Sequence, residues 1–432
     1  MLVTEAARPP ASDPDRFPVK TWLIAFAGWA FDFYDLVLFS FLLIPIGHEL
    51  GLTATQEAWL LGVALGGSGI GGIVFGYLSD LHGRKTVMMW TILLYSLGTA
   101  LTAFASGPWT LVLFRLITGL GVGGEWAVGH ALLAEASPAR MRGRASALLQ
   151  SGEPLGVALA ALMGLFATPV LGWRGVFLVS SASAAIAIVV RRHIPESRLW
   201  DRQRRAHLNP VEALRRLANA RLLGTLGKGF VLGVLKLGTY WTCYTWLPRF
   251  LQAPEFLNQP IARSAAWIVT AQLGQFLGML AFGVLADRHG RRQAFTGYSL
   301  LTAAALFPIA FHGRALVAEP VLFWSLLFAM GLGSGCTAGF GALLAELFPT
   351  DVRNVAMGTA YNTARGVQLF APIVVSFFVA HHGLPGGLGV PLVLAVLTAA
   401  WVWTLPETRF RDLGAIPTDE ARAPVPPTGR GM

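Results

Sequence analysis

Apolar stretches of about twenty residues recur twelve times along this 432-residue chain, and they limit what the chain can fold into. An α-helix needs about 20 such residues to cross the roughly 30 Å hydrocarbon core of a bilayer. The chain is 54% hydrophobic and only 13% charged, which is too little charge to cover a soluble protein of this length. The sequence therefore predicts an all-α membrane protein with twelve transmembrane helices.

The predicted spans form two groups of six, separated by a polar connection. The first group covers 21–46, 57–79, 86–106, 109–134, 144–168 and 173–192. The second group covers 225–250, 263–286, 293–312, 318–345, 355–381 and 388–405. We therefore expect an N-terminal tail over 1–20, a six-helix bundle over 21–192, a linker over 193–224, a second bundle over 225–405 and a C-terminal tail over 406–432.

The predicted linker contains a helix start signal. Asn209 and Pro210 have the composition of an N-cap and a first helical residue, and the basic pair Arg215 and Arg216 follows. We expect a basic amphipathic helix that lies on the membrane surface.

Basic residues are concentrated in alternate connections between the spans. By the positive-inside rule, this pattern predicts that both termini and the central linker are cytoplasmic. The net charge of +10 then reflects topology and contact with anionic membrane lipids, and nucleic acid is not expected as a partner. The basic residues in question include Arg84, Lys85, Arg140, Arg142, Arg144, Arg288, Arg291, Arg292 and Arg353.

Two motifs occur once in each group of spans. Residues 76–85, Gly-Tyr-Leu-Ser-Asp-Leu-His-Gly-Arg-Lys, recur 207 residues later as Gly-Val-Leu-Ala-Asp-Arg-His-Gly-Arg-Arg over 283–292. Residues 134–142, which include Ala-Glu and a closing Arg, recur 211 residues later over 345–353. Two similar halves in the same orientation predict pseudo-symmetric six-helix bundles with a solute site between them near the bilayer midplane.

The repeated Gly-x-x-x-Asp-x-x-Gly-Arg-Lys/Arg motif, together with Arg115-x-x-x-Gly119-x-Gly121-x-Gly123, resembles the major facilitator superfamily over nearly the whole chain. The resemblance implies a monomeric secondary transporter of the bacterial inner membrane. It would work by alternating access, driven by a proton gradient without a cofactor.

Three further segments resemble the proton-coupled carboxylate branch of that superfamily, which includes the lactate and sialate symporters. Nicotinate and aromatic-acid carriers are similar in the same places. The segments are Gly28-Trp-Ala-Phe-Asp32-Phe-Tyr-Asp35, Gly123-Gly-Glu125-Trp126, and Arg142-Gly followed by Gln150-Ser-Gly152.

Ionisable residues inside the predicted spans are few. A charge at a lipid-facing helix centre costs about 2.5 to 3.5 kcal/mol, so these residues should face the interior of the bundle. They are Asp32, Asp35, Arg115, Glu125, His130, Glu153, Lys236 and Arg365.

Asp35 and Arg115 are the predicted proton-coupling pair, because their positions resemble the acidic and basic partners of proton-linked sugar carriers. A carboxylate beside an arginine stays ionised, and it takes a proton when the arginine moves away. A permanent structural ion pair is the alternative. Asp32, one turn earlier, is a second candidate proton carrier. Glu125 and Glu153 are either further proton sites or partners in interhelical hydrogen bonds.

Two intramembrane cations predict a pocket for a small carboxylate. Lys236 shares a helix face with Tyr240, and Arg365 shares one with Asn362 and Gln368. Arginine offers a bidentate fork to a carboxylate. In the alternative reading, Glu125 or Glu153 pairs with these cations across the halves. Gln272, Gln275 and Trp126 are further candidate substrate contacts, or else packing residues.

The repeated motifs predict conformational latches at the water boundary and not a substrate site. Asp80 is expected to pair with Arg84, and Asp287 with Arg291, at helix ends joined by tight glycine turns. A second set of latches is predicted at Glu135, Arg142, Glu346 and Arg353, with each glutamate matched to the arginine that follows it.

We therefore expect proton-coupled symport of a small organic anion, such as a monocarboxylate. The alternatives are a proton-linked efflux antiporter, a sugar or aromatic-acid carrier, and a solute sensor. Residues 152–156, Gly-Glu-Pro-Leu-Gly, only partly match the element typical of exporters. An enzyme is not expected, because the sequence has no phosphate-binding loop, nucleophile elbow or metal-ligand spacing.

Overall fold

The computed structural model describes residues 18–183, 196–197, 200–201, 219–252, 257–258, 261–350, 352–411 and 413, and within these ranges the chain forms helices and no strands. The first half contains α1 (Val19–Leu50), α2 (Ala54–His82), α3 (Arg84–Thr102), α4 (Pro108–Ala136), α5 (Arg142–Gln150), α6 (Gly152–Leu162) and α7 (Thr168–Ser180). The second half contains α11 (Ala220–Gln252), α12 (Ile261–His289), α13 (Arg291–Leu316), α14 (Pro320–Ser334), α15 (Phe340–Leu347), α16 (Arg353–Val367) and α17 (Ala371–Trp401).

Short 3₁₀ or π turns join several of these helices into longer rods. The fifth predicted span consists of α5, α6, the π turn Met163–Ala167 and the start of α7, and Gly172 then bends the chain with a φ of 63°. The tenth span joins α14 to α15 through the 3₁₀ turn Gly335–Gly339. The eleventh runs from α16 into α17, and Gly383 divides α17 with a φ of 62°. The bends at Gly172 and Gly383 lie where the sequence predicted a break between two spans.

The predicted all-α architecture of twelve helical spans is confirmed, with the sixth span described only as far as Ser183, and most of the described helices extend a few residues beyond the apolar stretches. Helical hydrogen bonding continues past the point where hydropathy falls, as in α1, which runs four residues beyond the predicted end at 46. In the described part of the chain, eight helices are by themselves long and apolar enough to cross a membrane. The predicted amphipathic helix near Asn209 lies outside the described residues, as do 1–17 and 414–432.

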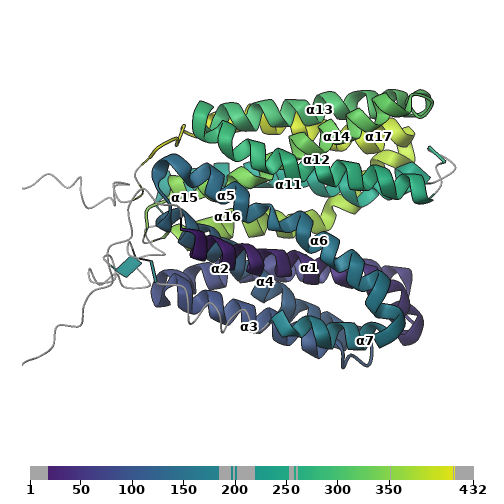
Figure 1. The fold of residues 1–432 in the computed structure, drawn as a ribbon, viewed down its shortest axis with the longest axis horizontal. Helices are drawn as coiled ribbons and strands as arrows, with labels where there is room; N and C mark the ends of the chain where they lie inside the picture. Colours follow the sequence, from purple (N-terminus) through teal and green to yellow (C-terminus); the bar gives the residue numbers. More distant parts are fainter. Residues whose placement is uncertain are drawn as a thin grey trace, which may run out of the picture.

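The two halves lie side by side with their helices roughly parallel to one long axis. Figure 1 shows the first half below, purple to teal, and the second half above, green to yellow. Within the halves, α2 packs on α4, α1 on α6, α12 on α14 and α13 on α17. Between the halves, α2 packs on α16 and α12 on α5. The predicted two-bundle architecture is therefore what the structure shows.

Glycines allow the closest of these helix contacts. A side chain at Gly119 would overlap the backbone of α2 at Ala64, and one turn later a side chain at Gly123 would overlap it at Ser68. Across the halves, a side chain at Gly358 would overlap the carbonyl of Gly72. Small residues let helix backbones approach each other where no hydrophobic force drives association in lipid.

The apolar cores differ between the two ends of the molecule. We call the end that contains Asp80 and Asp287 the loop-motif end. One core there is continuous across both halves, and it includes Trp126 of the first half and Tyr361 of the second. Toward the opposite end the core separates into two clusters, one formed only by the first half and one only by the second. A shared apolar core therefore joins the two halves at the loop-motif end.

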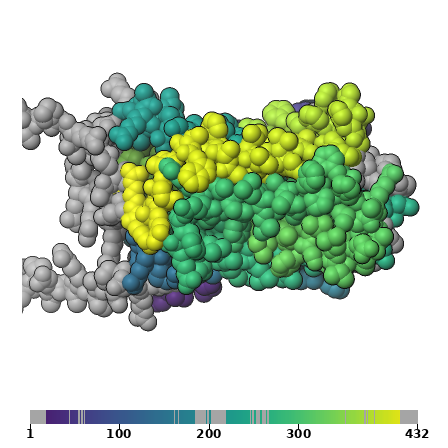
Figure 2. All heavy atoms as spheres, turned by 90° about the horizontal axis from the view of Figure 1, so that it is seen from above, coloured from purple at the N-terminus to yellow at the C-terminus, as the bar shows by residue number. Residues whose placement is uncertain are grey.

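Large apolar side chains also cover outer helix faces, where a soluble protein would carry charge. Leu97 is 52% exposed, Phe307 53% and Phe311 52%. In Figure 2, where the second half fills most of the face shown, the molecule is one elongated body. An apolar surface of this kind is stable in contact with lipid and would promote aggregation in water.

Replacing Gly119 with alanine should separate α2 from α4. We expect Gly119→Ala to destabilise the protein by about 1–3 kcal/mol, because overpacking against a backbone carbonyl forces the helices apart. Thermal unfolding in detergent measures the effect as a lower Tm. Gly297→Ala is the matched control, since nothing lies within 4 Å of its added methyl group. An equal Tm for both variants would contradict the packing argument.

Candidate functional site between the two halves

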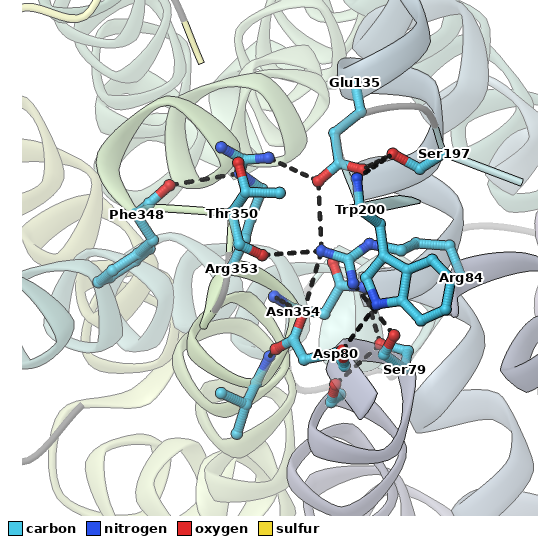
Figure 3. A network of polar contacts seen from close by, with 12 residues as sticks. Ser79, Asp80, Arg84, Glu135, Ser197, Trp200, Phe348, Thr350, Arg353 and Asn354 are labelled. Carbon is cyan, nitrogen blue, oxygen red and sulfur yellow. Dashed lines mark hydrogen bonds and ion pairs between the residues drawn. The ribbon is translucent and has the colours of Figure 1, made fainter. Parts of the chain in front are cut away.

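Polar residues from both repeated motifs gather at the loop-motif end. The first loop cluster consists of Asp80, Arg84, Glu135 and Arg353, whose side chains are at most 2% exposed. Arg84 contacts Asp80 at 3.1 Å and Glu135 at 3.3 Å, and Arg353 of the second half contacts Glu135 at 2.5 Å. Figure 3 shows Glu135 between the guanidinium groups of Arg84 and Arg353. This cluster therefore ties α4 of the first half to α16 of the second.

The second loop cluster is the equivalent set around the other motif, and it consists of Asp287, Arg291 and Glu346 of the second half and Arg142 of the first half. Arg291 contacts Asp287 at 2.7 Å and Glu346 at 2.9 Å. Arg142 donates a hydrogen bond across the halves to the carbonyl of Arg411 at 2.5 Å. It donates a second one within its own half to the carbonyl of Ala134 at 3.3 Å. This cluster also joins the halves.

The two motif aspartates cap helices that belong to the opposite half. Asp80 accepts hydrogen bonds from the backbone N–H groups of Asn354 and Val355, at the start of α16. Asp287 accepts them from Gly143 and Arg144, at the start of α5. Carboxylates stabilise helix N-termini through the free N–H groups and the helix dipole, so each aspartate holds the halves together.

Both predicted pairings in the second set of latches are wrong. Glu135 was matched with Arg142, but Glu135 contacts Arg84 and Arg353, and Arg142 donates to backbone carbonyls. The sequence matched Glu346 with Arg353, but Arg353 pairs with Glu135 of the other half, and Glu346 pairs with Arg291. The start of α16 lies against the end of α4, which brings these distant residues together. Sequence spacing within one motif does not contain that information.

The sequence analysis missed two residue pairs that complete the loop clusters. Glu196 accepts hydrogen bonds from the first backbone N–H groups of α3, and Ser197 bonds to Glu135. Glu407 accepts them from the first N–H groups of α13, and Thr408 donates to Glu346 at 2.7 Å. A signal was present, because Pro-Glu-Ser-Arg over 195–198 recurs as Pro-Glu-Thr-Arg over 406–409, again 211 residues later.

Asp35 and Arg115 lie together deep in the first half, as the sequence predicts. Arg115 contacts Asp35 at 3.2 Å and donates to the hydroxyl groups of Thr102 and Thr118. Thr99 donates to the other Asp35 oxygen at 2.5 Å. The carboxylate is thus fully satisfied in this form of the protein.

Arg365 lies where α16 meets α1. Its guanidinium is 5.6 Å from the ring centre of Trp29 and 5.0 Å from that of Phe33, and the residue is 1% exposed. Its two terminal nitrogens have no hydrogen-bond partner among the described residues. The alternative reading, an ion pair with Glu125 or Glu153, is not found among the salt bridges of the described residues, although Glu153 and Asp32 lie near enough to act on the charge of Arg365.

Glu153 links the two halves through side-chain amides. It accepts from Gln150 at 3.0 Å and from Gln275 of α12 at 3.2 Å. Gln150 in turn accepts from Trp126 and His130. Trp126 stacks on Tyr361 of the second half, with ring centres 3.7 Å apart. Four of the predicted residues thus belong to one network between the halves. They are Glu153, Gln275, Trp126 and His130, and the network also contains Gln150 and Tyr361.

The remaining predicted substrate contacts divide into two kinds. Lys236 is 1% exposed, and its ammonium has no partner in the described part of the chain. Tyr240 lies within hydrogen-bonding range of Glu153 and Gln272. Asn362 and Gln368 bond instead to backbone carbonyls, Asn362 to Gly123 across the halves and Gln368 within α16 and to α11. The last two therefore contribute to helix packing in this form.

Asp32 and Glu125 lie next to each other, on α1 and α4. Both are at most 2% exposed, and none of their carboxyl oxygens has a hydrogen-bond partner among the described residues. The described residues contain no group of three or more metal-ligating side chains.

Comparison with known proteins agrees with this geometry. The family model described as Major Facilitator Superfamily matches residues 22–258 and 257–430. A Cupriavidus pinatubonensis protein named "Probable 4-methylmuconolactone transporter" is 33% identical over 94% of this chain and 95% of its own length. The niacin transporter of Acinetobacter baylyi is 29% identical over 91% and 95%. The structure of a proton:xylose symporter covers 92% of this chain and 98% of its own, with a TM-score of 0.76 at 20% identity.

A duplicated bundle with an ionic cluster between its halves defines an integral membrane transport protein and not an enzyme. The chain belongs to the major facilitator superfamily. Its similar relatives place it in the organic-acid branch.

Removing the Asp80 carboxylate should open the loop-motif end. We expect Asp80→Asn to increase alkylation of Ala342→Cys about fivefold, because losing about 1 kcal/mol of helix capping shifts the conformational equilibrium by that factor. Ala342 is 1% exposed at this interface, and Cys243 and Cys336 would first be replaced by serine. Glu49→Gln, at the opposite end, is the control. Unchanged alkylation in Asp80→Asn would argue against a latch.

The stabilising effect of Glu407 should depend on pH. Burial opposes ionisation, but four backbone N–H groups outweigh it and hold the pKa of Glu407 below its ordinary value of 4.5. A lowered pKa stabilises the fold above that range, and the stabilisation is lost as falling pH protonates the group. The Tm deficit of Glu407→Gln should therefore be largest near pH 7 and shrink below about pH 4.5. A deficit independent of pH would show that the charge is not responsible.

Proposed function

We propose that this protein is a proton-coupled symporter that carries a small organic anion between its two halves. The observation that carries the proposal is Arg365, a buried guanidinium whose terminal nitrogens have no protein partner among the described residues. An uncompensated buried charge costs several kcal/mol. A position that keeps such a cation at the interface of the halves is suited to a negatively charged solute.

The surroundings of Arg365 favour a carboxylate. Its planar fork can bind both oxygens of a carboxylate group, and the rings of Trp29 and Phe33 hold the guanidinium in place by cation–π contact. Lys236, a second buried cation on α11, adds positive charge in the same half. Tyr240 and Gln272 are candidates for orienting the rest of the solute.

The packing of the two ends supports alternating access. Both loop clusters and the shared core close the loop-motif end, whereas the cores of the two halves are separate toward the opposite end. Rocking the halves about the central site would break the clusters and open the closed end. The Asp35–Arg115 pair is a candidate for linking this motion to a proton, because separation leaves a buried carboxylate without its cation.

The named relatives support the choice of an organic acid. Niacin, the solute named for one relative, carries a carboxylate, and the family also contains carriers of neutral sugars such as xylose. A sugar carrier would have little use for an unpaired arginine in its binding site. A carboxylate panel is therefore the first choice for assay.

Replacing Arg365 should weaken anion binding. We expect Arg365→Gln to lower the affinity for the transported acid by about 10- to 100-fold, because a charge-assisted hydrogen bond contributes about 1.5–3 kcal/mol. Arg365→Lys should fall between this variant and wild type, since it keeps the charge and loses the fork. Uptake by proteoliposomes with an imposed proton gradient measures the effect, using nicotinate, lactate, N-acetylneuraminate and cis,cis-muconate.

Arg314→Gln is the matched control, because it removes an exposed arginine from the same half. It should transport as wild type does. If wild-type protein neither accumulates any of these acids nor moves protons with them, the proposed function is wrong. If Arg365→Gln transports at full affinity, the anion binds elsewhere.

A further inference from the structure

The carboxyl groups of Asp32 and Glu125 form a buried pair between α1 and α4. They lie within hydrogen-bonding reach of each other, and no described residue donates to any of their four oxygens. Gly28 makes this arrangement possible, because a side chain there would overlap the Glu125 carboxyl group. Glu125 therefore lies over the turn of α1 that runs from Gly28 to Asp32.

A proton shared by the two carboxyl groups would satisfy this pair without moving the helices. Two ionised carboxylates in contact repel strongly in a buried site, and a shared proton removes one charge and supplies one hydrogen bond. Asp35, three residues from Asp32, does not need that proton, since Arg115 and Thr99 already satisfy it. The two acidic sites on α1 thus differ in chemistry.

Charged and titratable groups face the pair from several helices. Arg365 of α16 supplies positive charge and lies on the α1 face formed by Trp29, Asp32 and Phe33. Tyr95 of α3 faces both carboxyl groups, and its hydroxyl has no partner among the described residues. Asp35 of α1 adds negative charge. Glu153 of α6 also lies within range of Arg365.

We propose that Asp32 and Glu125 share one proton when the site is empty, and that an anion bound to Arg365 draws a second proton onto the pair. In the empty site, one negative charge on the pair offsets the positive charge of Arg365. A solute carboxylate that binds Arg365 takes over that role and leaves the pair with an uncompensated charge. A proton from water, bound to the free carboxylate oxygen, restores neutrality.

This arrangement couples solute and proton through competition for one cation. One anion and one proton enter together, and the loaded site has the same net charge as the empty one. The second step rests on the proposed function, because it requires an anionic solute. The first step, a shared proton in the empty protein, does not depend on it.

Infrared difference spectroscopy of the purified full-length protein tests the first step. Wild type in the absence of solute should show one carboxylic-acid C=O band at neutral pH. The band should be lost in both Asp32→Asn and Glu125→Gln, because either amide can donate to the remaining carboxylate. Asp35→Asn should retain it. A wild type without the band, or a band that persists in both single variants, would overturn the shared proton.

Proton uptake on binding tests the second step, with a pH indicator in weakly buffered solution and whichever acid of the panel wild type transports. We expect about one proton taken up per anion bound by wild type and close to none by Glu125→Gln. The ratio of proton-driven accumulation to counterflow should fall about tenfold in Asp32→Asn. Transport by wild type with full coupling in both variants would reject the carboxyl pair and leave the proposed function standing. Absence of transport by wild type would reject the proposed function, and the infrared result would still decide the pair.

Discussion

The cost of burying charge in an apolar helical bundle governs the arrangement of this protein. At the loop-motif end, each buried arginine of the loop clusters contacts a carboxylate or a backbone carbonyl, and the motif aspartates use free helix N–H groups. At the centre of the molecule not every buried charge has a partner. The charged groups of Arg365, Lys236, Asp32 and Glu125 lack hydrogen-bond partners within the described chain. Buried charges that have all their hydrogen-bond and ion-pair partners serve as structural contacts. Buried charges that lack such partners are the groups available to bind solute and proton.

Because the chain is duplicated, the two loop clusters have the same arrangement, and each of them joins the two halves. Each motif aspartate binds the start of a helix in the opposite half, so neither half completes its own polar contacts alone. The apolar core that both halves share lies at the same end. Opening that end therefore requires many buried contacts to break together, which is the condition for two discrete conformations and not a continuum.

Much of the fold could be predicted from the sequence, since hydropathy, glycine breaks and internal repeats are local signals. Twelve spans, two equivalent halves and the interior position of the charged residues all follow from residue order and helical periodicity. The Asp35–Arg115 contact was also predicted, although by resemblance and not by spacing. The Glu196 and Glu407 caps were not predicted, although their short motif recurs in the sequence, because spacing along the chain does not show which helix start each carboxylate caps.

The sequence by itself determined which residues lie inside the membrane and that a charge there must face protein. The tertiary structure alone decided which partner each charge has. Arg353 belongs to Glu135 and not to Glu346, Asn362 reaches a backbone carbonyl, and Asp32 meets Glu125. The physical reason is that these contacts join helices far apart in the chain. Their distances are set by how closely glycine-lined backbones approach, and residue spacing along one helix does not encode that.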